Sequence, residues 1–312
     1  MGNIRMKISY QIFRFVLKFE KKVNVDIYPS FLLRSILGKE LKTLGCIFMD
    51  RSTCEDCPIN DRCAYSYIFE SIISKDNDII KGRNRIPHPF IIKSDIDNFK
   101  LYDSFDFDIV LLGSAIDYFP YIYQSFIFGG EKGIGKDRIK YTVEKILHNG
   151  ENLLESSKMV KLPKIKSFWK NESGMTAALE RKITIKFISP FRHQKNNIIQ
   201  KDVSYSAVLT DCLRSILLLS SFYGDEKEFT EEKFDFNKFE ESKIVSKKLV
   251  WKDYSRYSAR QERKMSLGGL IGEMTIAGLF SPLELSLLYG GEIFSIGKNT
   301  GFGLGNIRLI IE

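Results

Sequence analysis

The sequence lacks any apolar run long enough to cross a bilayer. A membrane-spanning helix needs roughly 20 predominantly apolar residues, and no segment of the 312-residue sequence approaches that pattern. The N-terminus also lacks an apolar core followed by a small-residue cleavage site, so no signal peptide is predicted. We therefore expect a cytoplasmic protein without a membrane partner.

Histidine, the usual acid or base near neutral pH, is scarce: the chain has three. His88 lies between two prolines and His148 ends a predicted strand, so both are predicted to be structural. His193 follows the sequence SPFR in a basic loop and is the best histidine candidate for proton transfer.

Charge is unevenly distributed along a chain whose net charge is +8. Residues 158–201 carry a net charge of +9, residues 202–243 a net charge of −5, and residues 244–272 a net charge of +5. Two basic blocks around an acidic one indicate a directed electrostatic surface and an anionic partner.

Hydrophobic periodicity predicts the same order of elements, βαββαβ, in each half of the chain. In the first half, strands and helices are expected over residues 7–19, 28–44, 89–93, 105–112, 118–128 and 139–146. In the second half they are expected over residues 182–188, 205–222, 247–257, 270–277, 282–289 and 307–311. The fold class is therefore α+β, with two tandem ferredoxin-like (RRM-like) domains.

The domains are expected at residues 1–155 and 175–312, joined by a polar linker around residues 156–174. The first domain contains a small cysteine-bearing insertion at residues 46–63, and residues 225–241 form an acidic connection in the second.

Four cysteines fall within the insertion, at spacings of seven, two and five intervening residues. Because disulfides are disfavoured in the cytoplasm, a structural zinc site is the leading interpretation, and an iron–sulfur cluster is the alternative. Four thiolates would leave no open position on the metal for catalysis, so no catalytic metal is expected. The predicted ligands are Cys46, Cys54, Cys57 and Cys63.

Each predicted domain has a glycine-rich segment between its second helix and its last strand. The first, GGEKGIGKDR, resembles an NTP-binding loop but has Asp137 where a magnesium-ligating Ser or Thr is required, so an NTPase is excluded. Glycines let a backbone approach a ligand closely, and Lys or Arg beside them suits a phosphate chain. The predicted RNA-binding residues of the two loops are Lys132, Lys136, Arg138, Lys298, Asn299 and Phe302.

The segment WKDYSRYSARQERK interleaves aromatic and basic side chains. Aromatic rings stack on bases and Arg forms bidentate contacts with phosphate, so this segment also predicts RNA binding. Its candidate residues, together with the Arg of SPFR, are Tyr254, Arg256, Tyr257, Arg260 and Arg192.

Several motifs, in order, resemble Cas family six, the RAMP endoribonucleases that process precursor crRNA. They are YPSFLLRSILG, CAYSYIFE, GGEKGIGKDR, SPFR, RYSARQ followed by GGLIGE, and GKNTGFGLG. The resemblance spans nearly the whole chain. It implies binding of CRISPR repeat RNA and metal-independent cleavage, in which the RNA's 2′-hydroxyl attacks the adjacent phosphate and leaves a 2′,3′-cyclic phosphate.

Many members of this family place a histidine in or near the first helix, and this sequence has none there. Either His193 supplies the acid or base, or a histidine-free site uses cationic and phenolic groups. The candidates for the second arrangement are Arg34 and Tyr28, or Arg256, Tyr257 and Lys298.

Two alternatives to an endoribonuclease stay open. The chain could be a non-catalytic RAMP subunit that holds crRNA as a scaffold, or an RNA-binding protein unrelated to CRISPR. Further CRISPR effector subunits and a second copy in a homodimer are the protein partners considered.

Overall fold

The computed structural model describes residues 5–25, 27–49, 53–72, 86–95, 100–155, 158–159, 167–170, 178–228, 243–258 and 263–312. The chain forms two compact units. One unit is Ser9–Ser167, and the other combines Met1–Ile8 with Phe168–Glu312. The first residues of the chain therefore belong with the C-terminal half, a feature that the expected boundaries did not include.

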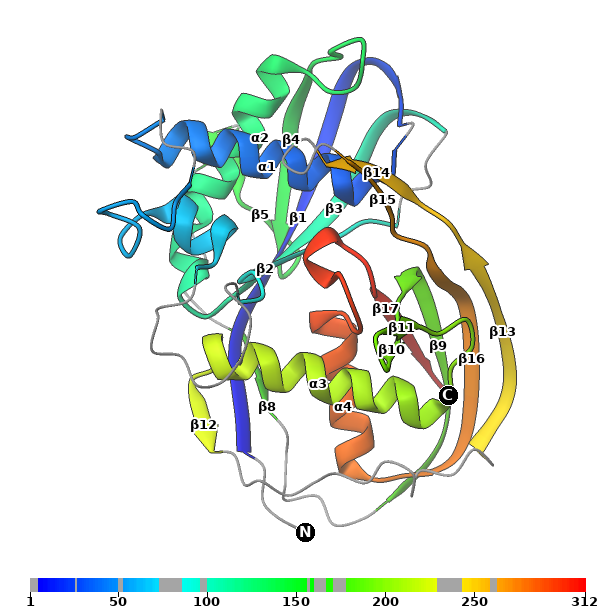
Figure 1. Ribbon diagram of the computed structural model, residues 1–312. Helices are drawn as coiled ribbons and strands as arrows, with labels where there is room; N and C mark the ends of the chain where they lie inside the picture. Colours follow the sequence, from blue (N-terminus) through cyan, green and yellow to red (C-terminus); the bar gives the residue numbers. More distant parts are fainter. Residues whose placement is uncertain are drawn as a thin grey trace. The chain divides into compact units, whose positions relative to one another are not determined.

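The N-terminal unit is built on an antiparallel sheet with the order β2-β3-β1-β4-β5. Helices α1 and α2 lie side by side against this sheet (Figure 1). Its elements are β1 (Arg5–Asn24), α1 (Pro29–Gly45), η1 (Ser66–Glu70), β2 (Phe90–Lys93), β3 (Leu101–Leu112), η2 (Gly113–Tyr118), α2 (Phe119–Lys132), β4 (Tyr141–His148), β5 (Glu151–Asn152), β6 (Leu154–Glu155) and β7 (Lys158–Met159).

The C-terminal unit repeats this arrangement, with a sheet of order β13-β16-β9-β17 and with α3 packed beside α4. Its main elements are β9 (Leu179–Phe191), α3 (Tyr205–Tyr223), β13 (Ile244–Lys252), β16 (Gly269–Phe280), α4 (Pro282–Phe294) and β17 (Ile307–Ile311). Its shorter elements are β8 (Ser167–Lys170), β10 (Gln194–Lys195), β11 (Ile198–Ile199), β12 (Glu226–Glu228), β14 (Ser255–Ser258), β15 (Arg263–Ser266) and η5 (Thr300–Phe302).

The main strands have the same order in both sheets. Numbered by their position along the chain within each unit, the order across the sheet is second, third, first, fourth. The two ferredoxin-like halves predicted from the sequence are therefore confirmed. One expected strand is divided: β13 ends at Lys252, and residues 255–258 form a separate hairpin with β15. Most of the acidic connection lies outside the described residues, but Glu226–Glu228 pairs with Arg5–Lys7 of β1.

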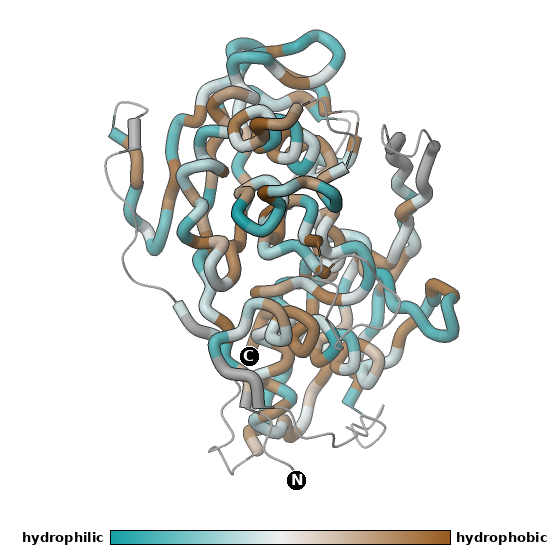
Figure 2. Tube along the Cα trace, turned by 60° about the vertical axis from the view of Figure 1, so that its left-hand side comes forward, coloured by the Kyte–Doolittle hydropathy of each residue, from teal (hydrophilic) through white to brown (hydrophobic). Residues whose placement is uncertain are grey.

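Alternation of apolar and polar residues explains how β1 forms the centre of the first core. Phe13, Phe15, Leu17 and Phe19 are all at most 5% exposed, and aromatic rings from α2 and β3 pack on them. Apolar residues, brown in Figure 2, run through the helices and strands, whereas several connecting loops are hydrophilic.

Contrary to the expectation that no segment approaches a membrane span, helix α3 is long and apolar enough to cross a membrane, although 56% of its apolar window is buried inside the protein. Its inward residues include Val208, Leu209 and Ile216, each 0% exposed. One such helix is weak evidence for a span, because the core helix of a globular unit has the same composition.

A buried carboxylate fixes the start of α4. Glu284, only 2% exposed, accepts the backbone N–H of Ser281 through Oε2 at 2.8 Å and completes a capping box. Its Oε1 accepts the Lys243 ammonium at 2.8 Å and the Tyr205 hydroxyl at 3.2 Å. Burial, with the Glu284 charge as a second cause, raises the pKa of Tyr205 above its usual range, so this hydroxyl stays a donor.

Replacing Glu284 by Ala should destabilise the C-terminal unit by about 3–5 kcal/mol, because it leaves the Lys243 ammonium largely buried without its counter-charge. Urea denaturation followed by circular dichroism measures the loss. Glu180→Ala, at an exposed position of β9, is the matched control and should change stability by no more than about 0.5 kcal/mol. Equal effects of the two substitutions would contradict this role for Glu284.

Candidate nucleic-acid interface

The end of β9 joins three segments that are far apart in the sequence. The carbonyl of Arg192 accepts the backbone N–H of Lys298 at 3.0 Å, and the Arg192 Nη1 donates to the carbonyl of Gly268. The carbonyl of Pro190 accepts the N–H of Gly305 at 3.0 Å. The SPFR sequence, the GG pair at the start of β16 and the terminal glycine loop therefore form one site within the C-terminal unit.

The terminal glycine loop lies against this strand end because its first glycine has no side chain. Gly297 has a φ of +82°, and a Cβ there would lie 2.8 Å from the carbonyl oxygen of Arg192. Asn299 also adopts a left-handed conformation, with a φ of +67°. The side chains of Lys298, Asn299 and Phe302 are half-buried beside the strand end. The loop thus carries a cation, an amide and an aromatic ring together, as predicted for contact with RNA.

Arg192 supplies a cation at this site. Its side chain is half-buried, whereas its Nε is fully buried without a hydrogen-bond partner among the described residues and is closed to a ligand. Burial lowers the pKa of the guanidinium from its usual value, but an arginine remains charged at neutral pH. The charge of this half-buried guanidinium is what Arg192 offers to a phosphate.

His193 points away from this site, into the base of α3. It is 8% exposed, and its Nδ1 lies 2.9 Å from Oδ2 of Asp211, which is itself 5% exposed. The histidine that the sequence favoured for proton transfer is therefore part of a buried pair that joins the end of β9 to α3.

The N-terminal unit contains two further predicted catalytic groups, Tyr28 and Arg34. Tyr28 is 4% exposed, and its ring packs edge-on against Phe31 at a centroid distance of 5.1 Å. Arg34, on α1, is 8% exposed, and its guanidinium lies 4.4 Å from the centre of the Phe69 ring. Both residues are largely enclosed by aromatic neighbours.

A histidine from outside α1 reaches Arg34. The Arg34 Nη2 lies 2.9 Å from Nε2 of His88, and the His88 Nδ1 lies 3.0 Å from Oγ of Ser71. Because a guanidinium can only donate, Nε2 must accept and the imidazole proton lies on Nδ1. The ring also stacks on Phe90 at 5.3 Å. The sequence treated His88 as structural, and its distance along the chain from Arg34 gave no signal of this contact.

The first glycine loop presents its cations differently. Lys132 forms an ion pair with Glu40 of α1, with Nζ and Oε2 2.5 Å apart, and Glu40 is 2% exposed. Lys136 and Arg138 are exposed in the turn between α2 and β4. Of the three predicted RNA-binding residues, Lys132 thus has a structural partner within its own unit.

The aromatic and basic segment after β13 is only partly described. Tyr254 is half-buried, and the Nζ of Lys252 lies 5.2 Å from the centre of its ring. Arg256 and Tyr257 lie on β14, where the backbone alone is described, and Arg260 lies outside the described residues. Trp251, in the same segment, received no role from the sequence although tryptophan is rare in this chain.

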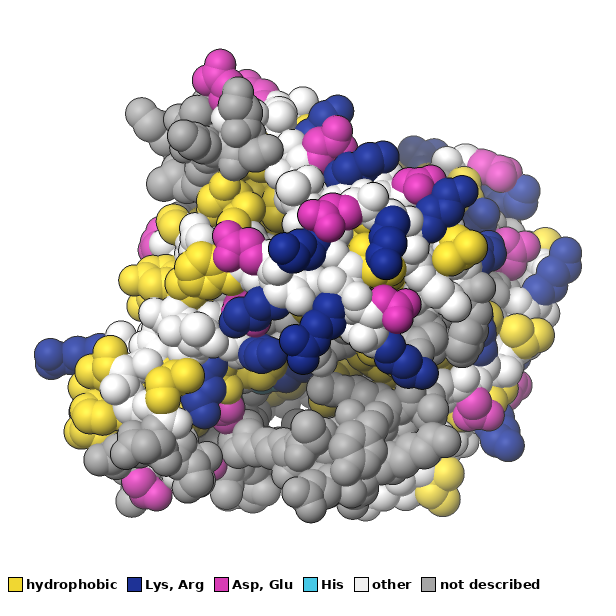
Figure 3. Space-filling model, turned by 90° about the horizontal axis from the view of Figure 1, so that it is seen from above, with side chains coloured by type: hydrophobic (Ala, Val, Ile, Leu, Met, Phe, Trp, Pro, Cys, Tyr) yellow, Lys and Arg dark blue, Asp and Glu magenta, His cyan; other side chains and the backbone are white. Residues whose placement is uncertain are grey.

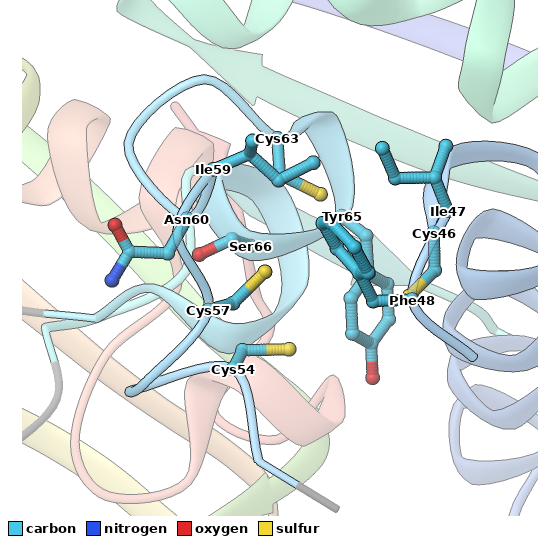
Figure 4. A pocket seen from close by; sticks show the side chains of 10 residues that line it. All are labelled: Cys46, Ile47, Phe48, Cys54, Cys57, Ile59, Asn60, Cys63, Tyr65 and Ser66. Carbon is cyan, nitrogen blue, oxygen red and sulfur yellow. The ribbon is translucent and has the colours of Figure 1, made fainter. Parts of the chain in front are cut away.

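The four cysteines of the insertion line one pocket but do not form a metal site. In Figure 4 the ring of Tyr65 is seen between Cys46 and the other three cysteines. Desolvation, with the nearby Glu70 charge as a second cause, raises the pKa of the Cys54 thiol. Among the described residues, no three His, Cys, Asp or Glu side chains are placed to hold a metal ion. The predicted structural zinc is therefore not supported.

Basic side chains are gathered on one visible face, but they are not alone there. Seen from above, Lys and Arg side chains cross the middle of the face with Asp and Glu side chains between them (Figure 3). A mixed surface of this kind favours local contacts by positioned groups over a uniform attraction for polyanions.

Comparison with protein-family models gives two matches. A model described as an N-terminal domain (AF_1859_N) matches residues 8–165, and the model of the CRISPR-associated endoribonuclease Cas6 matches residues 185–307. The second match contains Arg192, Gly268 and the terminal glycine loop. No curated protein matches the chain.

Solved structures share the fold at low sequence identity. A Cas6 product complex has a TM-score of 0.52 at 12% identity and covers 97% of this chain and 99% of its own. Thermus thermophilus Cas6 has a TM-score of 0.51 at 14% identity, with 99% and 100% covered. A chain of a partial Cas6-RT-Cas1–Cas2 complex has a TM-score of 0.56 at 11% identity.

The alignment with that last structure covers 98% of this chain but 46% of the other, so the protein spans about half the length of that relative. The Cas6 model covers the C-terminal part of the chain, residues 185–307. The Cas6 structures share the two-unit RAMP fold over nearly the whole chain.

Proposed function

We propose that the chain binds CRISPR repeat RNA and cuts precursor crRNA at a single position. The observation that carries the proposal is the meeting of Arg192, Gly268 and Lys298 within the segment matched by the Cas6 model. A structure of similar fold is a Cas6 bound to its product. The proposed ligand, RNA, is anionic, which agrees with the cationic side chains of Arg192 and Lys298 beside the end of β9.

In the proposed reaction the 2′-hydroxyl oxygen of one nucleotide attacks the adjacent phosphorus. The bond to the 5′-oxygen of the next nucleotide breaks, giving a 2′,3′-cyclic phosphate and a 5′-hydroxyl. One proton leaves the attacking oxygen and one is gained by the leaving oxygen. Negative charge builds on the phosphate oxygens, so fixed cations that contact them stabilise the transition state.

Arg192 and Lys298 are the residues that we assign to the phosphate. Arg192 is a half-buried cation, and the Lys298 backbone is held on the carbonyl of Arg192. No divalent metal is needed in this scheme, because the nucleophile belongs to the RNA and the protein supplies the positive charge. Tyr28 and Arg34 remain predicted catalytic groups, and His88 joins them through its contact with Arg34.

For His193 we propose a positioning role. Its buried pair with Asp211 anchors the residue that follows Arg192 and so fixes the direction of the arginine side chain. Proton transfer by His193 itself stays a prediction. The pH–rate profiles of His193→Ala and Asp211→Asn distinguish proton transfer from positioning.

Additional CRISPR proteins are proposed partners, since one structure of similar fold comes from a complex that includes Cas1 and Cas2. A homodimer stays a prediction.

Incubation of the purified protein with its repeat RNA in EDTA should give one cut. The upstream product should end in a 2′,3′-cyclic phosphate, which mass spectrometry and resistance to periodate identify. Tight binding without cleavage would instead favour the non-catalytic scaffold, and neither binding nor cleavage would contradict both.

Arg192→Ala should weaken RNA binding by about 1–3 kcal/mol, roughly a 5-fold to 150-fold increase in Kd, through loss of a charge-assisted contact with phosphate. The slope of log Kd against log salt should fall by about 1, as expected when one phosphate contact is lost. Arg181→Ala, at an exposed position of the same strand, is the control and should leave both quantities unchanged. An equal effect at both positions would indicate general electrostatics only.

His193→Ala and Asp211→Asn should both lower the single-turnover cleavage rate at least tenfold, and both should raise the Kd for RNA. The shape of the pH–rate profile should be the same in Asp211→Asn as in the natural protein, because a positioning residue moves Arg192 and transfers no proton. A lost limb in the profile of His193→Ala with an unchanged Kd would assign proton transfer to His193 instead.

A further inference from the structure

Trp251 lies at the end of the edge strand β13, beside cationic groups. It pairs with Leu270 of β16 and is half-buried. Its indole Nε1 donates to Oδ1 of Asp253 at 2.8 Å, and the Nζ of Lys201 lies 5.9 Å from the ring centre. The ring is therefore held in one orientation, with a cation near its π-system.

The other tryptophan of the chain shows what a core indole looks like. Trp169 is 5% exposed, donates its Nε1 to the carbonyl of Ser286 at 3.2 Å, and packs edge-on against Phe294 at 6.0 Å. Trp251 has none of these features: its N–H is bound by an exposed carboxylate and its strand is at an edge. Core packing does not account for a large aromatic side chain at this position.

The indole and the Arg192 guanidinium border the same glycine. A Cβ on Gly268 would lie 2.9 Å from two atoms of the indole and 2.3 Å from Oδ1 of Asp253. The carbonyl of the same glycine accepts the Nη1 of Arg192. Because Gly268 has no side chain, the indole of Trp251 and the guanidinium of Arg192 can both contact this one residue.

We propose that Trp251 stacks on an unpaired base of the bound RNA while Arg192 holds a neighbouring phosphate. The proposal rests on the proposed function, and it adds a single-stranded nucleotide as the ligand of this site. Stacking of a base on an aromatic side chain contributes about 1–3 kcal/mol and requires a base that is free of its own helical partners. Because Asp253 already orients the indole, little side-chain freedom is lost on binding.

Fluorescence offers a direct test, since the chain has two tryptophans. In the full chain carrying Trp169→Phe, all tryptophan emission comes from Trp251. We would titrate this variant with repeat RNA whose 2′-hydroxyls are methylated, which prevents attack on the phosphate. The emission should be quenched with the same Kd that fluorescence anisotropy of labelled RNA reports.

Substitutions test the energetic contribution separately. Trp251→Ala should raise the Kd about 5-fold to 150-fold, and Trp251→Phe should retain most of the affinity because a benzene ring also stacks. Gly268→Ala should weaken binding by displacing the indole, whereas Gly45→Ala, where a Cβ meets only ordinary contacts at 3.8 Å, should not. Far-ultraviolet circular dichroism and thermal unfolding report the folding of each variant.

The inference and the function on which it rests can fail separately. Absent quenching, with unchanged affinity in Trp251→Ala and a loss in Arg192→Ala, would overturn the stacking role and leave RNA binding in place. Equal losses in Trp251→Phe and Trp251→Ala at unchanged stability would also overturn it. If the natural protein neither binds nor cuts the repeat RNA, the proposed function fails together with the inference.

Discussion

The site depends on the backbone hydrogen bonds that tie the terminal glycine loop to the end of β9. Residues that precede and follow this strand end use their carbonyls to hold the loop, at Pro190 and Arg192. A side chain on Gly297 would push the loop away from the carbonyl of Arg192. Without this close approach, Lys298 and the arginine would belong to separate parts of the surface. The chemistry proposed for this chain therefore depends first on a contact between two stretches of backbone, which then places the side chains.

The periodic parts of the chain were readable from the sequence. Apolar residues at every second position of β1 and at helical spacing in α1 depend only on which face is buried, so the elements and their repetition were predicted correctly. The division of the expected strand at residues 247–257 was missed, because a continuous β-like composition does not reveal where a hairpin begins. The pairing of Glu226–Glu228 with the start of the chain joins segments too distant for any local pattern.

Individual side-chain partners were the least predictable part of the site. Lys298 was chosen as a cation in a glycine-rich loop and Arg192 as the arginine of SPFR, and the fold does bring them together. His193 was chosen because it lies in a basic loop, yet its imidazole is buried in a pair with Asp211. Its partner Asp211 lies on the next helix, and no spacing rule connects them. The chemistry of each residue type could be used for prediction, whereas the direction in which its side chain points could not be predicted.

Two residues that the sequence left aside, His88 and Trp251, share a physical property. Each has a polar ring nitrogen bound by a charged neighbour, Arg34 in one case and Asp253 in the other, so each ring is fixed before any ligand arrives. A fixed ring loses little freedom on binding, which favours the stacking proposed for Trp251. The contact of His88 has a different consequence, because it holds the guanidinium of Arg34, a predicted catalytic group, within the N-terminal unit.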